Sequence, residues 1–163
     1  MKFTNRFKYL GTYLAQNLSD DTDHINERIL TASKNFNALG KELFRNRKIS
    51  LHIRCRLYVA TTINILLWGC DTWALTQLQL DKIEVFHRRC IRRMIGITMH
   101  HVKEYEIKNE YILEKSNLKS AETYLRIRQL RFLTHIAHMD PARLPRQVIN
   151  SQATAQGTCL RNV

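Results

Sequence analysis

The chain has 163 residues, of which 44% are hydrophobic and 25% are charged. This length fits one domain, or one domain with an appendage, and leaves no room for two large ones. Only five glycines and two prolines are present, too few for a β fold with many tight turns. The composition therefore predicts a mainly α fold.

The charge balance is strongly basic, with 26 Lys and Arg against 14 Asp and Glu and a formal net charge of +12. Such an excess attracts polyanions, and nucleic acid is the partner we expect. A membrane surface is the rival polyanion. The longest apolar run, from Ile63 to Trp68 and broken by Asn64, is much shorter than the roughly 20 residues of a membrane span. We therefore expect no membrane partner.

The N-terminal sequence MKFTNRFKYLG lacks the continuous apolar stretch of a secretory signal. This predicts an intracellular protein, nuclear or cytoplasmic, with reduced cysteines. The four cysteines form no Cys-x-x-Cys pair, so neither a zinc ribbon nor a disulfide framework is indicated. Cys55 and Cys90 fit helical faces and are expected to be core thiols.

The first 50 residues predict one β element and one long helix. Aromatic and β-favouring residues around Gly11 predict a short β element at Lys8 to Leu14. Capping oxygens then precede apolar residues that recur every three or four positions from Ile25. This period predicts an amphipathic helix from about Asp21 to Asn46.

Two further helix starts are marked by capping residues. Ser50 is placed to cap a helix that is apolar on nearly every face and ends at Gly69. Thr76 and Gln79 have the spacing of a capping box, and Gly96 is placed to end the helix that they begin. The sequence thus predicts a bundle of three principal helices up to Gly96.

The rest of the chain is less regular. A short helix is expected at Asn109 to Lys115, and a fourth helical segment near residues 120–139, closed by Pro141 and Pro145. The tail after Asn150 shows no apolar period. The expected organisation is a β element in 1–18, a helical domain in 19–97, a downstream helical segment in 98–149 and a disordered tail in 150–163.

The cations are clustered along the chain. Residues 41–56 contain six Lys or Arg against Glu42 alone, and the third helix adds four arginines around its apolar stripe. Cations on an outer helical face contact phosphates without reading sequence, although a solvated helix face has the same pattern. The predicted nucleic-acid contacts are Lys8, Arg45, Arg47, Lys48, Arg88, Arg89, Arg92, Arg93, Arg128 and Arg131.

Aromatic residues are interleaved with these cations. Exposed rings could stack on bases, but the spacing of most of them matches the apolar faces, so we expect them chiefly in the core. They are Phe44, Tyr58, Trp68, Trp73, Phe86, Tyr105 and Tyr124.

No complete catalytic or metal site is predicted. Asp20, Asp21 and Asp23 follow the β element, as metal-binding carboxylates of a polymerase or nuclease would, but helix capping explains them better. Two histidine pairs, His100 with His101 and His135 with His138, have no obvious further ligands. The enzyme hypothesis, an intact polymerase or nuclease that uses the three aspartates, is the rival of the binding hypothesis.

Four segments in order carry a resemblance to a known family: FKYLGTYL, INERILTASKNFNALGKELF, LYVATTINILLWGCDTWALT and LDKIEVFHRRCIRRMIGI. They resemble the C-terminal portion of reverse transcriptases from non-LTR retrotransposons, just beyond the catalytic palm. The later RIRQLRFLTHIAHMDPARLPRQVI is similar to a downstream segment of that family, so the resemblance covers residues 7–149. Departures from the family pattern occur at Trp68, Asp71, Thr134 and His138.

The resemblance implies a thumb, a helical lobe that grips the RNA/DNA template-primer duplex of an RNA-directed DNA polymerase. It implies a primer-grip role for Phe7, Tyr9, Leu10 and Gly11. The family's Asp-Asp box, which binds catalytic Mg²⁺, belongs to a palm that would precede Phe7. We therefore expect a fragment that is not itself an enzyme, has no cofactor of its own and acts beside a palm, which could be separately encoded. The alternative is a non-catalytic helical interaction module or an inactive retrotransposon relic.

Overall fold

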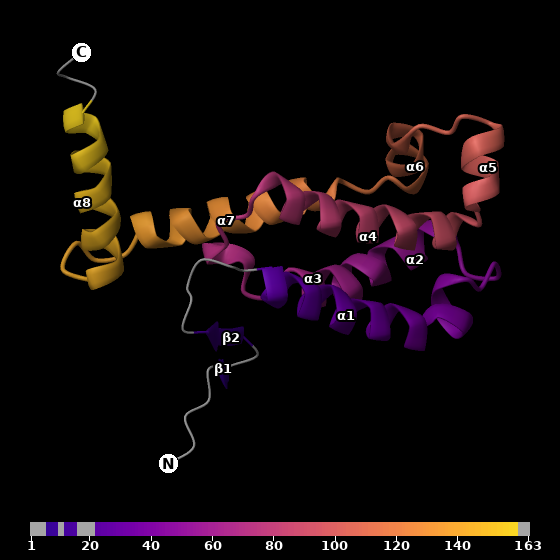
Figure 1. The fold of residues 1–163 in the computed structure, drawn as a ribbon, viewed down its shortest axis with the longest axis horizontal. Coiled ribbons are helices and arrows are strands. Elements are labelled where there is room, and N and C mark those ends of the chain that lie inside the picture. Colours follow the sequence, from indigo (N-terminus) through magenta and orange to yellow (C-terminus); the bar gives the residue numbers. More distant parts are fainter. Residues whose placement is uncertain (1–5, 10–11, 16–21, 160–163) are drawn as a thin grey trace. The chain divides into compact units, whose positions relative to one another are not determined.

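The computed structural model describes residues 6–9, 12–15 and 22–159, with side chains described from residue 23 to 151. The chain divides into two compact units, Met1–Leu125 (unit 1) and Arg126–Val163 (unit 2). Helices dominate both (Figure 1), so the prediction of a mainly α fold is confirmed. Near the N-terminus, β1 (Arg6–Tyr9) and β2 (Thr12–Ala15) pair antiparallel, with Tyr9 opposite Thr12.

The first helix is shorter than its apolar period predicts. α1 covers Thr22–Ala38 and is followed by a π-helical turn at Gly40–Phe44. The amide N–H groups of Phe44 and Arg45 donate to carbonyls five residues earlier. Gly40 lies where the α-helical pattern gives way, and glycine has little helix propensity. The predicted extension of the helix to Asn46 is therefore wrong, and this turn redirects Arg45.

The second predicted helix is present and contains a wide turn. α2 (Leu51–Tyr58) continues through a π-helical turn at Val59–Ile63 into α3 (Asn64–Leu66). The Ser50 hydroxyl accepts from the Ile53 N–H, and Gly69 adopts a left-handed conformation with φ 74° just beyond the helix. Tyr58, Ile63 and Leu66 are fully buried. The prediction of a buried central helix bounded by Ser50 and Gly69 is confirmed.

The third predicted helix begins and ends at the expected residues. α4 covers Gln77–Ile95. The Gln79 N–H donates to the Thr76 hydroxyl, and the Gln79 side chain accepts from the Thr76 N–H at 2.9 Å, so both halves of the capping box form. Gly96 ends the helix at φ 86°, where a side chain would be strained. Its buried face includes Ile83 and Phe86.

The capping box provides a direct test of this helix start. Thr76→Ala removes the oxygen that accepts from the Gln79 N–H, so we expect the free energy of unfolding to fall by about 1 kcal/mol. Thr76→Ser keeps that oxygen and serves as the matched control. Urea denaturation of both variants measures the difference, and an equal loss in the two would contradict a capping role.

The core of unit 1 extends beyond the three principal helices. α1 packs against α3 and α4, and α2 packs against α4 and α6 (Figure 1). Ile112 of α6 (Asn109–Ser116), and Ala121 and Leu125 of α7 (Ala121–Ala137), belong to the same hydrophobic cluster as the first helices. The compact unit thus continues to Leu125, beyond residue 97, where the sequence placed a boundary.

Helix is more extensive downstream than the sequence predicts. The predicted helices at 109–115 and near 120–139 are present as α6 and α7. α5 (Met99–Glu104) was not predicted, and α8 (Leu144–Cys159) occupies most of the tail expected to be disordered. Pro145 lies in the first turn of α8, where proline is well tolerated. The alanines and glutamines of 152–156 favour helix without an apolar period.

The core contains a polar chain of side chains. The Tyr58 hydroxyl lies 2.9 Å from Nδ1 of the fully buried His87, whose Nε2 lies 2.9 Å from the Lys119 carbonyl oxygen. Since a carbonyl only accepts, Nε2 carries the proton and Nδ1 accepts from Tyr58. Burial lowers the pKa of His87 and raises that of Cys90 to about 12. The predictions of core thiols at Cys55 and Cys90 are confirmed.

The buried imidazole predicts a pH dependence of stability. Since the pKa of His87 is lower in the folded chain than its ordinary 6.5, the unfolded chain binds the proton more readily. Its contribution to stability is therefore complete above about pH 6.5 and is lost as the pH falls through the lower folded value. Unfolding measured between pH 5 and pH 7.5 should show a steeper decline for the native chain than for His87→Gln.

Candidate nucleic-acid interface

Four arginines line one hollow where the end of α1 and the π-helical turn meet the end of α4. The hollow has a volume of about 650 Å³. Among the described residues that line it, every ionisable side chain is an arginine. We call this site the arginine groove, and its lining is Phe36, Asn37, Gly40, Arg45, Arg89, Arg92, Arg93, Gly96, Ile97, Thr98 and Met99.

The π-helical turn brings Arg45 to this groove. The Arg45 Nε donates to the Gly40 carbonyl oxygen at 3.3 Å. A Cβ at Gly40 would lie 3.7 Å from the same guanidinium, and a Cβ at Gly96 would lie 3.5 Å from Nη2 of Arg47. Both distances are ordinary van der Waals contacts, so the two guanidiniums lie close to the backbone of these glycines. Arg47 therefore lies beside the groove, although it does not line the hollow itself.

The two walls are tied together by a side-chain hydrogen bond. Nη1 of Arg93 donates to Oδ1 of Asn37 on α1 at 3.2 Å. Burial, followed by repulsion from Arg88 and Arg89, lowers the pKa of Arg92, although a guanidinium stays charged at neutral pH. A bound anion would relieve this repulsion. Guanidinium groups are donors that hydrogen-bond an anion such as a phosphate, and four of them border this hollow.

A purely structural account explains only part of this arrangement. Arg92 and Arg93 lie in the last turn of α4, where cations stabilise the negative end of a helix. Arg89 lies a turn earlier, over the ring of Phe86 at 5.7 Å, and Arg45 comes from another element. Helix stabilisation does not account for the convergence of these two on the same hollow.

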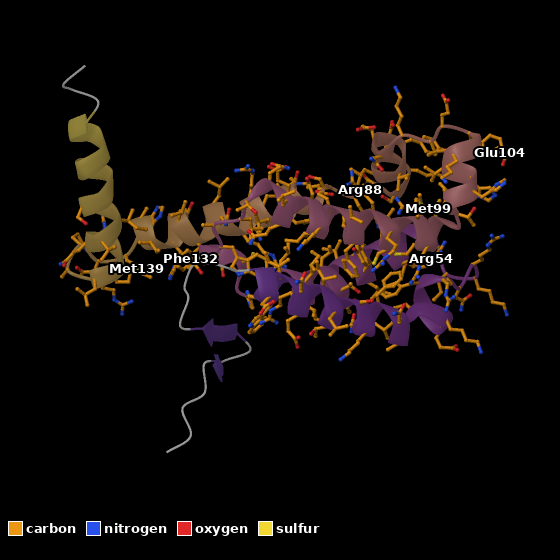
Figure 2. All side chains as sticks on the ribbon, viewed as in Figure 1. Arg54, Arg88, Met99, Glu104, Phe132 and Met139 are labelled. Atoms are coloured by element: carbon orange, nitrogen blue, oxygen red, sulfur yellow. The ribbon has the colours of Figure 1, made fainter. Side chains whose placement is uncertain are left out.

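The other cations of the predicted set lie elsewhere or are not described. Arg88 is half-buried on α4 (Figure 2), and neither it nor the exposed Lys48 lines the groove. Arg128 and Arg131 belong to unit 2, where Arg131 is exposed. The structure places Lys8 in β1 without describing its side chain. The structure does not test phosphate contacts at any of these positions, which stay predictions.

The predicted primer-grip residues fall in the N-terminal hairpin. Phe7 and Tyr9 lie in β1, and their side chains are not described. Leu10 and Gly11 lie outside the described residues, as do Asp20 and Asp21 of the acidic trio. Asp23 lies exposed in the first turn of α1, as expected of a residue that favours a helix start.

Arg54 is a cation whose structural role the sequence does not reveal. It is buried (labelled in Figure 2), and its Nη1 donates to the carbonyl oxygens of Phe44 at 3.0 Å and Met94 at 2.7 Å. It thus joins the last turn of α4 to the π-helical turn that supplies Arg45. The cation cluster in residues 41–56 therefore contains a groove residue, Arg45, and a buried brace, Arg54.

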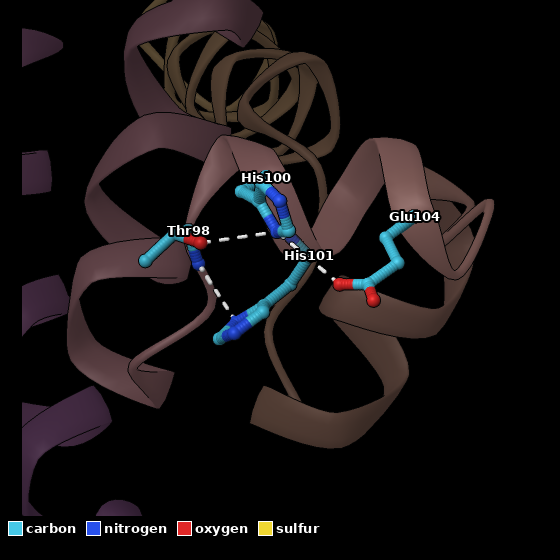
Figure 3. A network of polar contacts seen from close by, with 4 residues as sticks. All are labelled: Thr98, His100, His101 and Glu104. Carbon is cyan, nitrogen blue, oxygen red and sulfur yellow. Dashed lines mark hydrogen bonds and ion pairs between the residues drawn. The ribbon is translucent and has the colours of Figure 1, made fainter.

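The histidine pairs make local contacts. Figure 3 shows the start of α5, where the Thr98 hydroxyl accepts from the His101 N–H and Nδ1 of His101 lies 3.4 Å from the Thr98 nitrogen. Nδ1 of His100 lies 3.2 Å from a Glu104 carboxylate oxygen. His138 Nδ1 lies 2.8 Å from a carbonyl oxygen of its own helix turn. No cluster of three metal-binding side chains occurs among the described residues.

The aromatic residues divide into a buried and an exposed group. Phe44, Tyr58, Trp73 and Phe86 are buried and Tyr124 is half-buried against the core, which confirms that most of the named rings belong to the core. Trp68 and Tyr105 are exposed instead, and Tyr111, which the sequence did not single out, joins them.

None of the helices described has both the length and the apolar content of a membrane span.

Comparison with known proteins finds a similarity to a transposon-derived protein. The chain is 23% identical over 91 residues to a transposon-derived, uncharacterised protein of Caenorhabditis elegans. This similarity points to a transposon origin. The aligned region covers 56% of this chain and 33% of the nematode protein, so the chain matches about a third of that relative. No protein-family model and no solved structure matches the chain.

Proposed function

We propose that the chain grips the phosphate backbone of nucleic acid through the arginine groove, as the thumb-like part of a transposon-encoded reverse transcriptase. The observation that carries the proposal is the convergence of Arg45, Arg89, Arg92 and Arg93 on one hollow in which every ionisable lining residue is a cation. A guanidinium group donates two parallel hydrogen bonds to the oxygens of one phosphate. Such contacts position a duplex without reading its sequence.

Two further observations support the assignment to a reverse transcriptase thumb. The order of segments from FKYLGTYL to RMIGI resembles the region just beyond the palm of non-LTR enzymes. The similarity to a transposon-derived protein agrees with a mobile-element origin. In this proposal the RNA/DNA template-primer is the partner, and a palm supplies the Asp-Asp box and its Mg²⁺. The chain alone then incorporates no nucleotide.

A salt titration tests the proposal. A purified chain is mixed with a labelled primed RNA template, and fluorescence anisotropy gives the affinity between 50 and 200 mM salt. Four phosphate contacts predict a slope of log affinity against log salt near about −3.6, or a loss of roughly 100-fold over this range. Heparin at equal charge serves as a competitor. If the geometry of the duplex matters, heparin should displace the template-primer less than charge alone predicts.

Three results would contradict the proposal. Affinity that does not change with salt would remove phosphate binding. Self-association without any affinity for nucleic acid would favour the rival reading, a helical interaction module or an inactive relic. Magnesium-dependent nucleotide incorporation by the chain alone would instead favour the enzyme hypothesis.

A further inference from the structure

Two exposed tyrosine rings, Tyr105 at the end of α5 and Tyr111 in α6, line one hollow. The hollow has a volume of about 550 Å³ and is lined by Tyr105, Glu106, Ile107, Lys108 and Tyr111; we call it the tyrosine hollow. Tyr105 is 66% exposed and Tyr111 is 47% exposed. Large apolar rings that stay in water around a concavity are typical of a binding surface.

The helix before the hollow is held in place by its own contacts. The capping box of Thr98 and His101 fixes the start of α5 (Figure 3), and the Tyr105 N–H donates to the His101 carbonyl oxygen at 3.0 Å. The ring centroids of His101 and Tyr105 lie 6.3 Å apart. The backbone at Tyr105 is therefore fixed without a ligand, while the ring of Tyr105 stays largely in water.

The turn itself directs neighbouring side chains to opposite sides. Glu106 has a φ of 45°, in the left-handed region that costs a residue with a Cβ conformational energy. After it, the Ile107 N–H donates to the Val102 carbonyl oxygen at 3.1 Å, and the Ile107 side chain packs against the core. This backbone reversal keeps Ile107 on the core while Tyr105 stays exposed.

Charged side chains of both signs surround the hollow and suit different parts of a nucleotide. Lys108 lines the hollow, and the Lys115 ammonium lies 5.4 Å from the Tyr111 ring centre and 3.2 Å from its hydroxyl. Residues 103–115 carry these two lysines and Lys103 against Glu104, Glu106, Glu110 and Glu114, so Lys108 and Lys115 offer individual phosphate contacts rather than a net positive field. Glu106 also lines the hollow, so a phosphate inside it would be repelled. A carboxylate accepts from the N–H groups on the edge of a base, and a tyrosine ring stacks on its face.

We propose that the tyrosine hollow binds an unpaired nucleobase of single-stranded nucleic acid. The base stacks on Tyr105 or Tyr111, Glu106 accepts from its edge, and Lys108 and Lys115 contact the flanking phosphates. The inference rests on the proposed function in taking nucleic acid as the partner. The site is separate from the arginine groove, since the two share no lining residue.

Binding of an abasic strand isolates the contribution of the bases. Two single-stranded DNA oligomers of equal length, one with bases and one fully abasic, carry the same phosphates. Fluorescence anisotropy at about 0.15 M salt should show the base-bearing strand binding the native chain at least about fivefold more tightly, the effect of one stacked base. Equal affinity for the two strands, or no binding of either, would overturn the proposal.

Matched variants locate the effect. The double variant Tyr105→Leu/Tyr111→Leu should lose the preference for bases, whereas Tyr105→Phe/Tyr111→Phe keeps both rings and should retain it. Circular dichroism confirms that the helices persist, which is expected because both rings are exposed. A preference that survives in the leucine variant would place base binding elsewhere and overturn the assignment to this hollow.

A further double variant tests the arginine groove independently of the tyrosine hollow. Arg89→Gln/Arg92→Gln should weaken binding of a duplex and leave the ratio between the base-bearing and abasic strands unchanged. A native chain that binds no duplex but still prefers bases would retain the tyrosine hollow and reject the proposed grip. A chain that binds the duplex but shows no preference for the base-bearing strand would support the arginine groove and reject the tyrosine hollow.

Discussion

Replacing Arg89 and Arg92 together with glutamine is expected to weaken binding to a primed RNA template by about 30-fold. Both guanidiniums line the groove, and a charge-assisted contact to phosphate contributes on the order of 1 kcal/mol after solvent screening. Two lost contacts should also make the slope of log affinity against log salt shallower by about 2. Anisotropy titrations at several salt concentrations measure both quantities.

The control for this variant removes the same charge from another surface. Lys34 and Arg56 are exposed and do not line the groove, so Lys34→Gln/Arg56→Gln also lowers the net charge by two. If binding depended only on the overall field of the molecule, both double variants would lose affinity equally. That outcome would reject the arginine groove as a distinct site.

Arg54→Met is expected to lower the free energy of unfolding by about 2–3 kcal/mol. The change leaves the carbonyl oxygens of Phe44 and Met94 without the donor that Arg54 provides, and unsatisfied buried polar groups are costly. The loss is limited because the Arg54 Nε is buried without a hydrogen-bond partner, a cost that methionine removes. Chemical denaturation measures the difference.

The neighbouring arginine offers a matched comparison. Arg56 is exposed on the same helix, so Arg56→Met should change stability by less than about 0.5 kcal/mol. Arg54→Lys should recover only part of the loss, since the lysine side chain is shorter and its ammonium does not reach the position of Nη1, which makes both hydrogen bonds. Equal effects of the two methionine variants would mean that Arg54 does not brace the two chain segments.

The helix ends that follow local rules were predictable. Thr76 with Gln79, Ser50 and Gly96 each satisfy or terminate backbone groups within a few residues, so their spacing in the sequence carries the information. The start of α5 follows the same geometry with His101 in place of the usual glutamate or glutamine. A search for acidic or amide partners misses it, whereas a search for any acceptor at that spacing finds it.

The convergence of the four arginines on one groove was not predictable from the sequence, because it depends on turns and packing. Arg45 and Arg54 belong to one cluster of cations, yet one lines the groove and the other is buried against two carbonyls. The π-helical turn at Gly40–Phe44 determines the position of Arg45, and tertiary packing against α4 determines that of Arg54. Charge density alone cannot separate a ligand contact from an internal brace.

The wide turn at Val59–Ile63 sets the angular phase between the two halves of the central helix. Each residue of an α-helix advances the chain by about 100° around its axis, and a π-helical turn accommodates one additional residue. Removing one residue there would rotate Leu66 and Leu67 relative to Tyr58 and turn them from the core, where all three are buried. In related transposon sequences, a one-residue gap within this turn would therefore mark a change in which side of the helix faces inward.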